Sequence, residues 1–157
     1  MLRPHSSWNR ARLVGYCRPS RLAAVIAIGV VGVFLSGCGF TKAKKDAENL
    51  LNRHFQTIAT NGYEAAIADY GKQFFQNHTK DEWSKTLARL KARLGTYQSH
   101  TVTSWRVFKK SGTFGSGTTV EMVCQTAYSN HSSEERFVIF KGVLDSDYKI
   151  VGHYIGS

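Results

Sequence analysis

The sequence predicts an α+β domain in which three N-terminal helices pack on a curved four-stranded antiparallel sheet. Up to Leu94, apolar side chains recur every three to four residues, which is typical of amphipathic helices. From Tyr97 onwards the period changes to two, which is typical of strands, and clusters of turn residues interrupt it. A run of helices followed by a run of strands joined by short connections is the order of elements in α+β folds.

The first 37 residues differ in composition from the rest of the chain. Residues 1–21 contain five arginines and no acidic residue, and fourteen apolar residues follow from Leu22 to Leu35. A membrane-spanning helix needs about 20 apolar residues, so this shorter run suits the apolar core of a signal peptide. The tetrapeptide Leu35-Ser36-Gly37-Cys38 then places two small residues directly before a cysteine.

Together, in this order, these features resemble a bacterial lipoprotein signal. The resemblance implies cleavage between Gly37 and Cys38, acyl chains on Cys38, and a domain held at a membrane and facing the periplasm. Gly39 stands where enteric lipoproteins kept at the inner membrane carry aspartate, which favours the outer membrane. The alternative is an uncleaved N-terminal anchor. The expected organisation is a signal peptide (1–37), a lipidated cysteine with a short tether (38–42) and an α+β domain (43–157).

The charge of the expected mature chain does not favour a nucleic-acid partner. The full sequence has 21 basic and 11 acidic side chains, a formal net charge of +10. Removing the five arginines of the signal leaves a net charge of about +5. Such a modest excess affects solubility and steering toward anionic surfaces, and it indicates no specific site.

The cysteines exclude a disulfide framework in the mature domain. Cys17 would leave with the signal and Cys38 would carry lipid, so Cys124 would remain alone. Cys124 lies in an apolar strand pattern without other ligands at metal spacing, and we expect it to be a small buried hydrophobic residue. No metal and no cofactor is predicted.

Three helices are expected in the first half of the domain. Residues 43–60 carry an apolar stripe, beside which His54 is expected at the boundary. A shorter helix is expected over residues 63–70. Thr79 and Glu82 have the spacing of a capping box and begin the third helix, which Gly95 ends.

Four strands are expected in the second half. Short turns join them, so neighbouring strands should be antiparallel. The third strand has apolar side chains on both faces and is placed in the interior of the sheet. The expected strands are Tyr97 to Lys109, Thr118 to Tyr128, Ser133 to Lys141 and Tyr148 to Ile155.

Residues 43–155 resemble the nuclear transport factor-like and cystatin-like α+β superfamily, and most closely its small bacterial periplasmic members of unassigned function. The resemblance is carried by the order of elements and by four short motifs. These are Leu94-Gly95, Ser104-Trp105-Arg106, Glu135-Arg136-Phe137 and the closing segment from Tyr148 to Tyr154. Tyr148 stands where such members often have tryptophan at the start of the final strand.

The resemblance implies a pocket between the sheet and the helices. The same aromatic residues at helix and strand spacing also suit an ordinary core, and that interpretation is preferred. The candidate lining residues are Tyr63, Tyr70, Trp83, Trp105, Met122, Phe137 and Tyr154.

Enzymatic members of this superfamily place a histidine and an acid in that pocket as a general base and its orienting partner. Here the candidates are His100, His153 and Asp69, but the strand pattern places no acid beside either histidine. No catalytic residue is therefore predicted, and alanine at His100 or His153 is expected to leave function intact.

The sequence thus favours a lipid-anchored cell-envelope protein that acts as a non-enzymatic binding or interaction module. Its expected partners are the membrane, through the lipid on Cys38, and an envelope protein or a second copy of the chain. A small-ligand enzyme of the dehydratase or isomerase type is the alternative. A module that dimerises through apolar residues on its sheet, such as Trp105 or Val107, is the third hypothesis.

Overall fold

A computed structural model describes the backbone of residues 22–112 and 115–156 and the side chains of residues 39–109 and 115–156. The chain divides into two compact units, residues 1–35 and residues 36–157, and each is considered by itself. In the first unit, the described residues 22–35 are helical. The arginine-containing residues 1–21 of the expected signal peptide lie outside the described residues. Within the part of the chain that is described, no helix is both long and apolar enough to cross a membrane.

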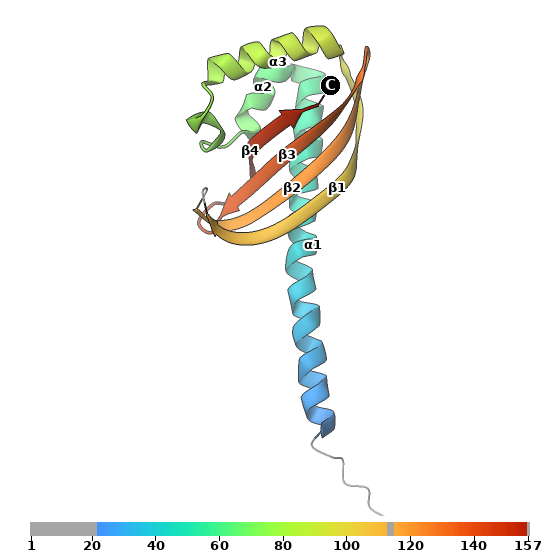
Figure 1. The fold of residues 1–157 in the computed structure, drawn as a ribbon, viewed down its shortest axis with the longest axis vertical. Coiled ribbons are helices and arrows are strands. Elements are labelled where there is room, and N and C mark those ends of the chain that lie inside the picture. The colour runs from blue at the N-terminus through green and yellow to red at the C-terminus, as the bar shows by residue number, and fades with distance from the viewer. Residues whose placement is uncertain (1–21, 113–114, 157) are drawn as a thin grey trace, which may run out of the picture. The chain divides into compact units, whose positions relative to one another are not determined.

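The protein has the expected α+β class, with helices α1, α2 and α3 followed by a four-stranded antiparallel sheet (Figure 1). Helix α1 (Leu22–Asn61) begins well before the expected Ala43 and includes the residues expected to form a tether. The predicted helix 63–70 is wrong in its second half. Helix α2 (Tyr63–Ala66) gives way to the 3-10 turn η1 (Ile67–Asp69), and Tyr70 is extended.

Helix α3 (Lys80–Leu94) begins and ends where the sequence predicts. Thr79 accepts a hydrogen bond from the backbone N–H of Glu82, and the Glu82 side chain accepts one from the backbone N–H of Thr79, so the capping box is confirmed. Gly95 ends the helix with φ +89°, a backbone conformation that side chains disfavour. A second 3-10 turn, η2 (Phe74–Gln76), lies between α2 and α3.

The sheet has the order β1-β2-β3-β4, and β3 is an interior strand, as expected. The first hairpin is longer than predicted, because β1 and β2 continue pairing through Lys110–Gly117 to Gly112–Gly115, which shortens the turn. The strands are β1 (Tyr97–Gly112), β2 (Gly115–Tyr128), β3 (Ser132–Gly142) and β4 (Lys149–Ile155).

One face of the sheet joins the hydrophobic core. Residues directly opposite each other in an antiparallel pair share a face, so Trp105, Met122, Phe137 and His153 form one row across all four strands. Helix α1 contributes to the same core, since the ring of Phe55 lies 5.7 Å from that of Phe137. We call this side the inner face.

The two edges of the sheet differ. Tyr70 forms a parallel bridge with Ile150, and the Gly71 amide donates to the Ile150 carbonyl (2.8 Å), so a loop segment covers part of the β4 edge. Along β1 the pairing register shifts twice, between Tyr97 and Ser99 and between Val102 and Ser104. Such shifts bend a strand and increase its twist.

Candidate functional site

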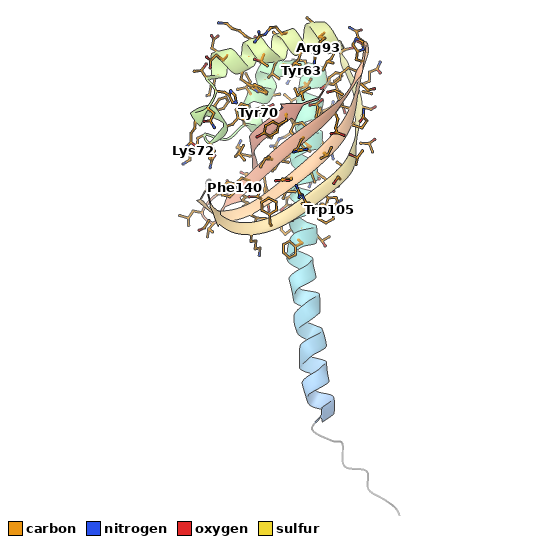
Figure 2. All side chains as sticks on the ribbon, in the orientation of Figure 1. Tyr63, Tyr70, Lys72, Arg93, Trp105 and Phe140 are labelled. Carbon is orange, nitrogen blue, oxygen red and sulfur yellow. The ribbon has the colours of Figure 1, made fainter. Side chains whose placement is uncertain are left out.

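The structure does not bring the seven candidate pocket residues together. Five of them join the hydrophobic core or pack against it: Tyr63, Tyr70, Trp83, Met122 and Phe137. Trp105 and Tyr154 are exposed, because Trp105 is on the edge strand and Tyr154 points away from the inner face. Figure 2 shows Tyr63 and Tyr70 toward α3 and Trp105 in the opposite half of the sheet.

His153 has an acidic partner, contrary to the expectation from sequence. Its Nε2 lies 2.7 Å from Oε2 of Glu135, and its Nδ1 lies 2.7 Å from the Tyr70 hydroxyl. The Tyr128 hydroxyl donates to the other oxygen of Glu135 at 2.6 Å. All four side chains are buried, so they form one polar chain through the core. The strand pattern in the sequence did not show that Glu135 faces His153 from β3.

This environment favours a charged Glu135. Burial acts to raise the pKa of Glu135, but the hydrogen bond and charge of His153, together with the Tyr128 hydroxyl, outweigh it, so the pKa lies below its ordinary value. Burial raises the pKa of Tyr70 and of Tyr128, and both stay neutral donors or acceptors. A buried carboxylate with this many partners is held in one orientation.

A second histidine–acid pair lies nearby and was missed in the sequence. His54 is buried, and its Nδ1 lies 3.2 Å from Oδ2 of Asp69, whose other oxygen accepts from Nη2 of Arg53 at 2.9 Å. Burial lowers the pKa of His54, although Asp69 opposes the shift. The pKa of Asp69 is also lowered, because the hydrogen bonds from His54 and Arg53 outweigh its burial. The expectation that His54 lies at the stripe boundary is wrong.

The two pairs differ in what they leave free. Both ring nitrogens of His153 are engaged, whereas Nε2 of His54 is buried without a hydrogen-bond partner among the described residues. The rings of His54 and His153 lie 6.4 Å apart. His54 therefore has the arrangement of a base oriented by an acid, and His153 that of a fixed structural group.

Among the residues that the structure describes, no acidic side chain hydrogen-bonds to His100. Its Nδ1 lies 2.8 Å from the Tyr97 hydroxyl, and its ring stacks on Phe55 at 4.3 Å. Burial lowers its pKa. Among the described residues, no three His, Cys, Asp or Glu side chains are grouped to hold a metal ion.

A groove of about 590 Å³ lies at the end of the sheet formed by the β1–β2 hairpin and the β3–β4 turn. Lys109, Thr118 and Lys141 lie opposite one another on three adjacent strands, so two lysines flank a threonine in one row of the inner face. Lys42 and Asp46 of α1 line the same groove, as do Val143 and Tyr148. We call it the basic groove.

The basic groove carries an excess of positive charge. Lys42 is paired with Asp46 at 2.6 Å, while Lys141 donates to the Ser146 carbonyl at 2.6 Å, with its Nζ 5.8 Å from the centre of the Tyr148 ring. Lys109 is exposed. Three lysines and one carboxylate line the groove, so it is suited to an anionic group.

A smaller groove adjoins the basic groove. It measures about 280 Å³, shares Lys42 and Tyr148 with the basic groove, and is also lined by Arg53. Arg53 in turn binds Asp69, the partner of His54. Neither groove is lined by His54 or His153.

Comparison with known proteins identifies the family of the chain. The family model described as a protein of unknown function, DUF4019, matches residues 51–153. None of the curated proteins and none of the solved structures matches the chain. The matched region covers more than half of the chain and contains both histidine–acid pairs and most of the sheet. The chain therefore belongs to the DUF4019 family of proteins of unknown function.

Proposed function

We propose that this protein is a lipid-anchored cell-envelope protein whose α+β domain, of the nuclear transport factor-like and cystatin-like type, acts as a binding module. The observation that carries the proposal is the basic groove, in which lysines from α1, β1 and β3 surround about 590 Å³. The groove is also lined by Gly39, which directly follows the cysteine proposed to carry lipid. The ligand of the groove is an anionic group, and the anchor keeps the domain at a membrane.

Crosslinking in intact cells tests this proposal. A photoreactive amino acid replaces Val143, an exposed residue that lines the groove, and the matched control replaces Gln125, an exposed residue of β2 that points to the other face. We expect a specific adduct at position 143 and none at position 125. The same purification gives the mass of the N-terminal residue, which should be an acylated Cys38.

Two results would contradict the proposal. Equal or absent crosslinking at the two positions would reject the groove as a binding site. An N-terminus that is unprocessed or carries no lipid would reject the anchor.

A second candidate function, an enzyme that uses a histidine as general base, is favoured by one observation. His54 is oriented by Asp69 and keeps a free buried Nε2, as a proton-accepting imidazole requires. Replacing His54 by glutamine keeps a donor to Asp69 but removes the base. Loss of a cellular phenotype in a folded H54Q protein, with crosslinking at position 143 unchanged, would favour the enzyme over the binding module.

A further inference from the structure

Four exposed apolar side chains gather at the same end of the domain as the basic groove. Among the described residues, the large apolar side chains that are most exposed are Phe40, Trp105, Val143, Leu144 and Tyr154. Val143 lines the groove, and Leu144 follows it in the β3–β4 turn with 98% of its surface exposed. Phe40 directly follows Gly39, which also lines the groove.

Trp105 belongs to the same end of the domain. It lies on the inner face of β1, as Lys109 does, and the Nζ of Lys44 is 5.4 Å from the centre of its ring. Lys44 is one helical turn after Phe40 on α1. Figure 2 shows Trp105 in the half of the sheet away from α3. Tyr154 is the exception, since it lies on the opposite face of β4 from the buried His153.

We infer that this end of the domain docks on the surface of an anionic lipid bilayer, with Val143, Leu144, Phe40 and Trp105 at the boundary between headgroups and acyl chains. The inference rests on the proposed function for the anchor at Cys38, and it names the ligand of the basic groove as the phosphate of a lipid headgroup. Tryptophan, other apolar side chains and lysines are the residues that peripheral proteins place at this boundary.

The position of the groove supports a membrane over a soluble ligand. Gly39 lines the groove and follows Cys38 directly, so acyl chains on Cys38 would enter the bilayer beside the lysines. Three lysines and one carboxylate line the groove, so its net charge is positive. This positive charge complements the negative charge of phosphate headgroups. The docking surface thus adds a second membrane signal to the lipid.

The test places a polarity-sensitive fluorophore on the full lipidated protein reconstituted into vesicles. The label is attached to Leu144→Cys, and the matched control carries it on Tyr154→Cys; the native Cys124 is buried, so it does not compete for the reagent. One set of vesicles contains about a third phosphatidylglycerol in phosphatidylcholine, and the other contains phosphatidylcholine alone. Protection from a quencher dissolved in water reports docking.

We expect protection at position 144 in the anionic vesicles and none at position 154. Replacing Lys42, Lys109 and Lys141 together by glutamine should shift the docking equilibrium on the order of 100-fold toward the undocked form, because each lysine near an anionic surface contributes roughly fivefold. An unprotected label at position 144 on protein with an acylated Cys38 would overturn the docking surface and leave the anchor intact.

The remaining outcomes separate the two proposals. Equal protection in neutral vesicles, unaffected by the lysine substitutions, would overturn headgroup recognition by the groove. An N-terminal mass without lipid would remove the anchor, while the label at position 144 would still report whether the surface docks. A protein adduct at position 143 in cells, with no lipid adduct, would preserve the binding module and overturn the membrane as its ligand.

Discussion

At the scale of single residues, the buried charge of Glu135 depends most on His153. Nε2 of His153 lies within hydrogen-bond distance of one carboxylate oxygen of Glu135, and the Tyr128 hydroxyl donates to the other. Removing one partner of a buried ion pair leaves an uncompensated charge in a medium that solvates it poorly. The pair is therefore a point at which a single substitution has a large effect on stability.

We predict that His153→Ala lowers the free energy of unfolding by about 3–5 kcal/mol, as measured by urea denaturation. The sequence-based expectation for the same substitution concerned function, which was expected to stay intact, and not stability. The neighbouring Tyr154→Ala is the control, and it should change the free energy by no more than about 0.5 kcal/mol because Tyr154 is exposed. Similar effects of the two substitutions would mean that the Glu135–His153 contact contributes little.

His54 should make stability depend on pH. Its pKa in the folded protein lies below the ordinary 6.5, so below that pH the unfolded chain binds a proton that the folded protein resists. Stability is thus complete above pH 6.5 and decreases as the pH falls below it. His100 acts in the same direction, while Asp69 and Glu135, whose pKa values are lowered, add losses at more acidic pH.

We predict that His54→Gln reduces the decrease in urea midpoint between about pH 7.5 and about pH 5.5 without abolishing it, since His100 remains. The later loss, below about pH 4, should persist in both proteins because Asp69 and Glu135 are still present. Identical slopes for the two proteins between the first two pH values would contradict the assigned environment of His54.

At the scale of elements, two glycines with the same backbone conformation differ in their surroundings. Gly62 has φ +84° and Gly95 has φ +89°, which disfavours any side chain at either position. A Cβ on Gly62 would meet no atom within 4 Å, whereas one on Gly95 would collide with the Ser129 side chain. Ser129 also accepts a hydrogen bond from the Thr96 amide at 3.0 Å, so the β2–β3 turn holds the end of α3.

We predict that Gly62→Ala lowers the free energy of unfolding by about 1–3 kcal/mol through backbone strain alone. Gly95→Ala should lower it further, since it adds displacement of Ser129 and loss of its hydrogen bond to Thr96. Thermal or urea unfolding of the two variants measures the difference. Equal losses would show that the turn at Ser129 moves without resistance.

Local signals in the sequence predicted the elements that depend on neighbouring residues. Thr79 and Glu82 are three residues apart and define the start of α3, and the alternation of Val120, Met122 and Cys124 predicts the inner face of β2. The 3-10 turn at Ile67–Asp69 was not predictable in this way. It ends where Asp69 binds Arg53 and His54 of α1 and where Tyr70 pairs with Ile150 of β4.

The candidate sites depended on long-range geometry and were only partly predictable. His153 and Glu135 meet because the β3–β4 register shifts between Val138 and Ile139, and sequence periodicity contains no such information. His54 occupies a position on the apolar stripe of α1, which was a signal of burial that the prediction of a boundary residue overlooked. The basic groove needed the register of three strands before its lysines could be placed in one row.

At the scale of the whole molecule, Cys124 reports on cooperative unfolding. It is a free cysteine on the inner face of β2, it is buried in the core, and burial raises its pKa to about 12. Alkylation requires a thiolate that is accessible to the reagent. Both conditions fail while the sheet is intact.

We predict that iodoacetamide modifies Cys124 only in globally unfolded molecules. The extent of Cys124 labelling should therefore follow the same urea transition as the circular dichroism of the sheet. Peptide mass spectrometry distinguishes Cys124 from the other two cysteines. Labelling well before that transition would show that β2 opens locally. The urea concentration at the midpoint of unfolding should not change when a reductant is added, because the described residues contain no disulfide.

Under the proposed lipid anchor, copies of the protein would share a membrane surface, and the bent edge of β1 then has a consequence for how they meet. Confinement to a surface brings copies of a protein into frequent encounter, and a long, straight edge strand would allow one sheet to continue into the next. The two register shifts of β1 interrupt its row of free backbone groups, and the segment at Tyr70 and Gly71 covers part of the β4 edge. Copies held at a membrane by the proposed anchor are therefore expected to crowd in two dimensions without forming continuous intermolecular sheets.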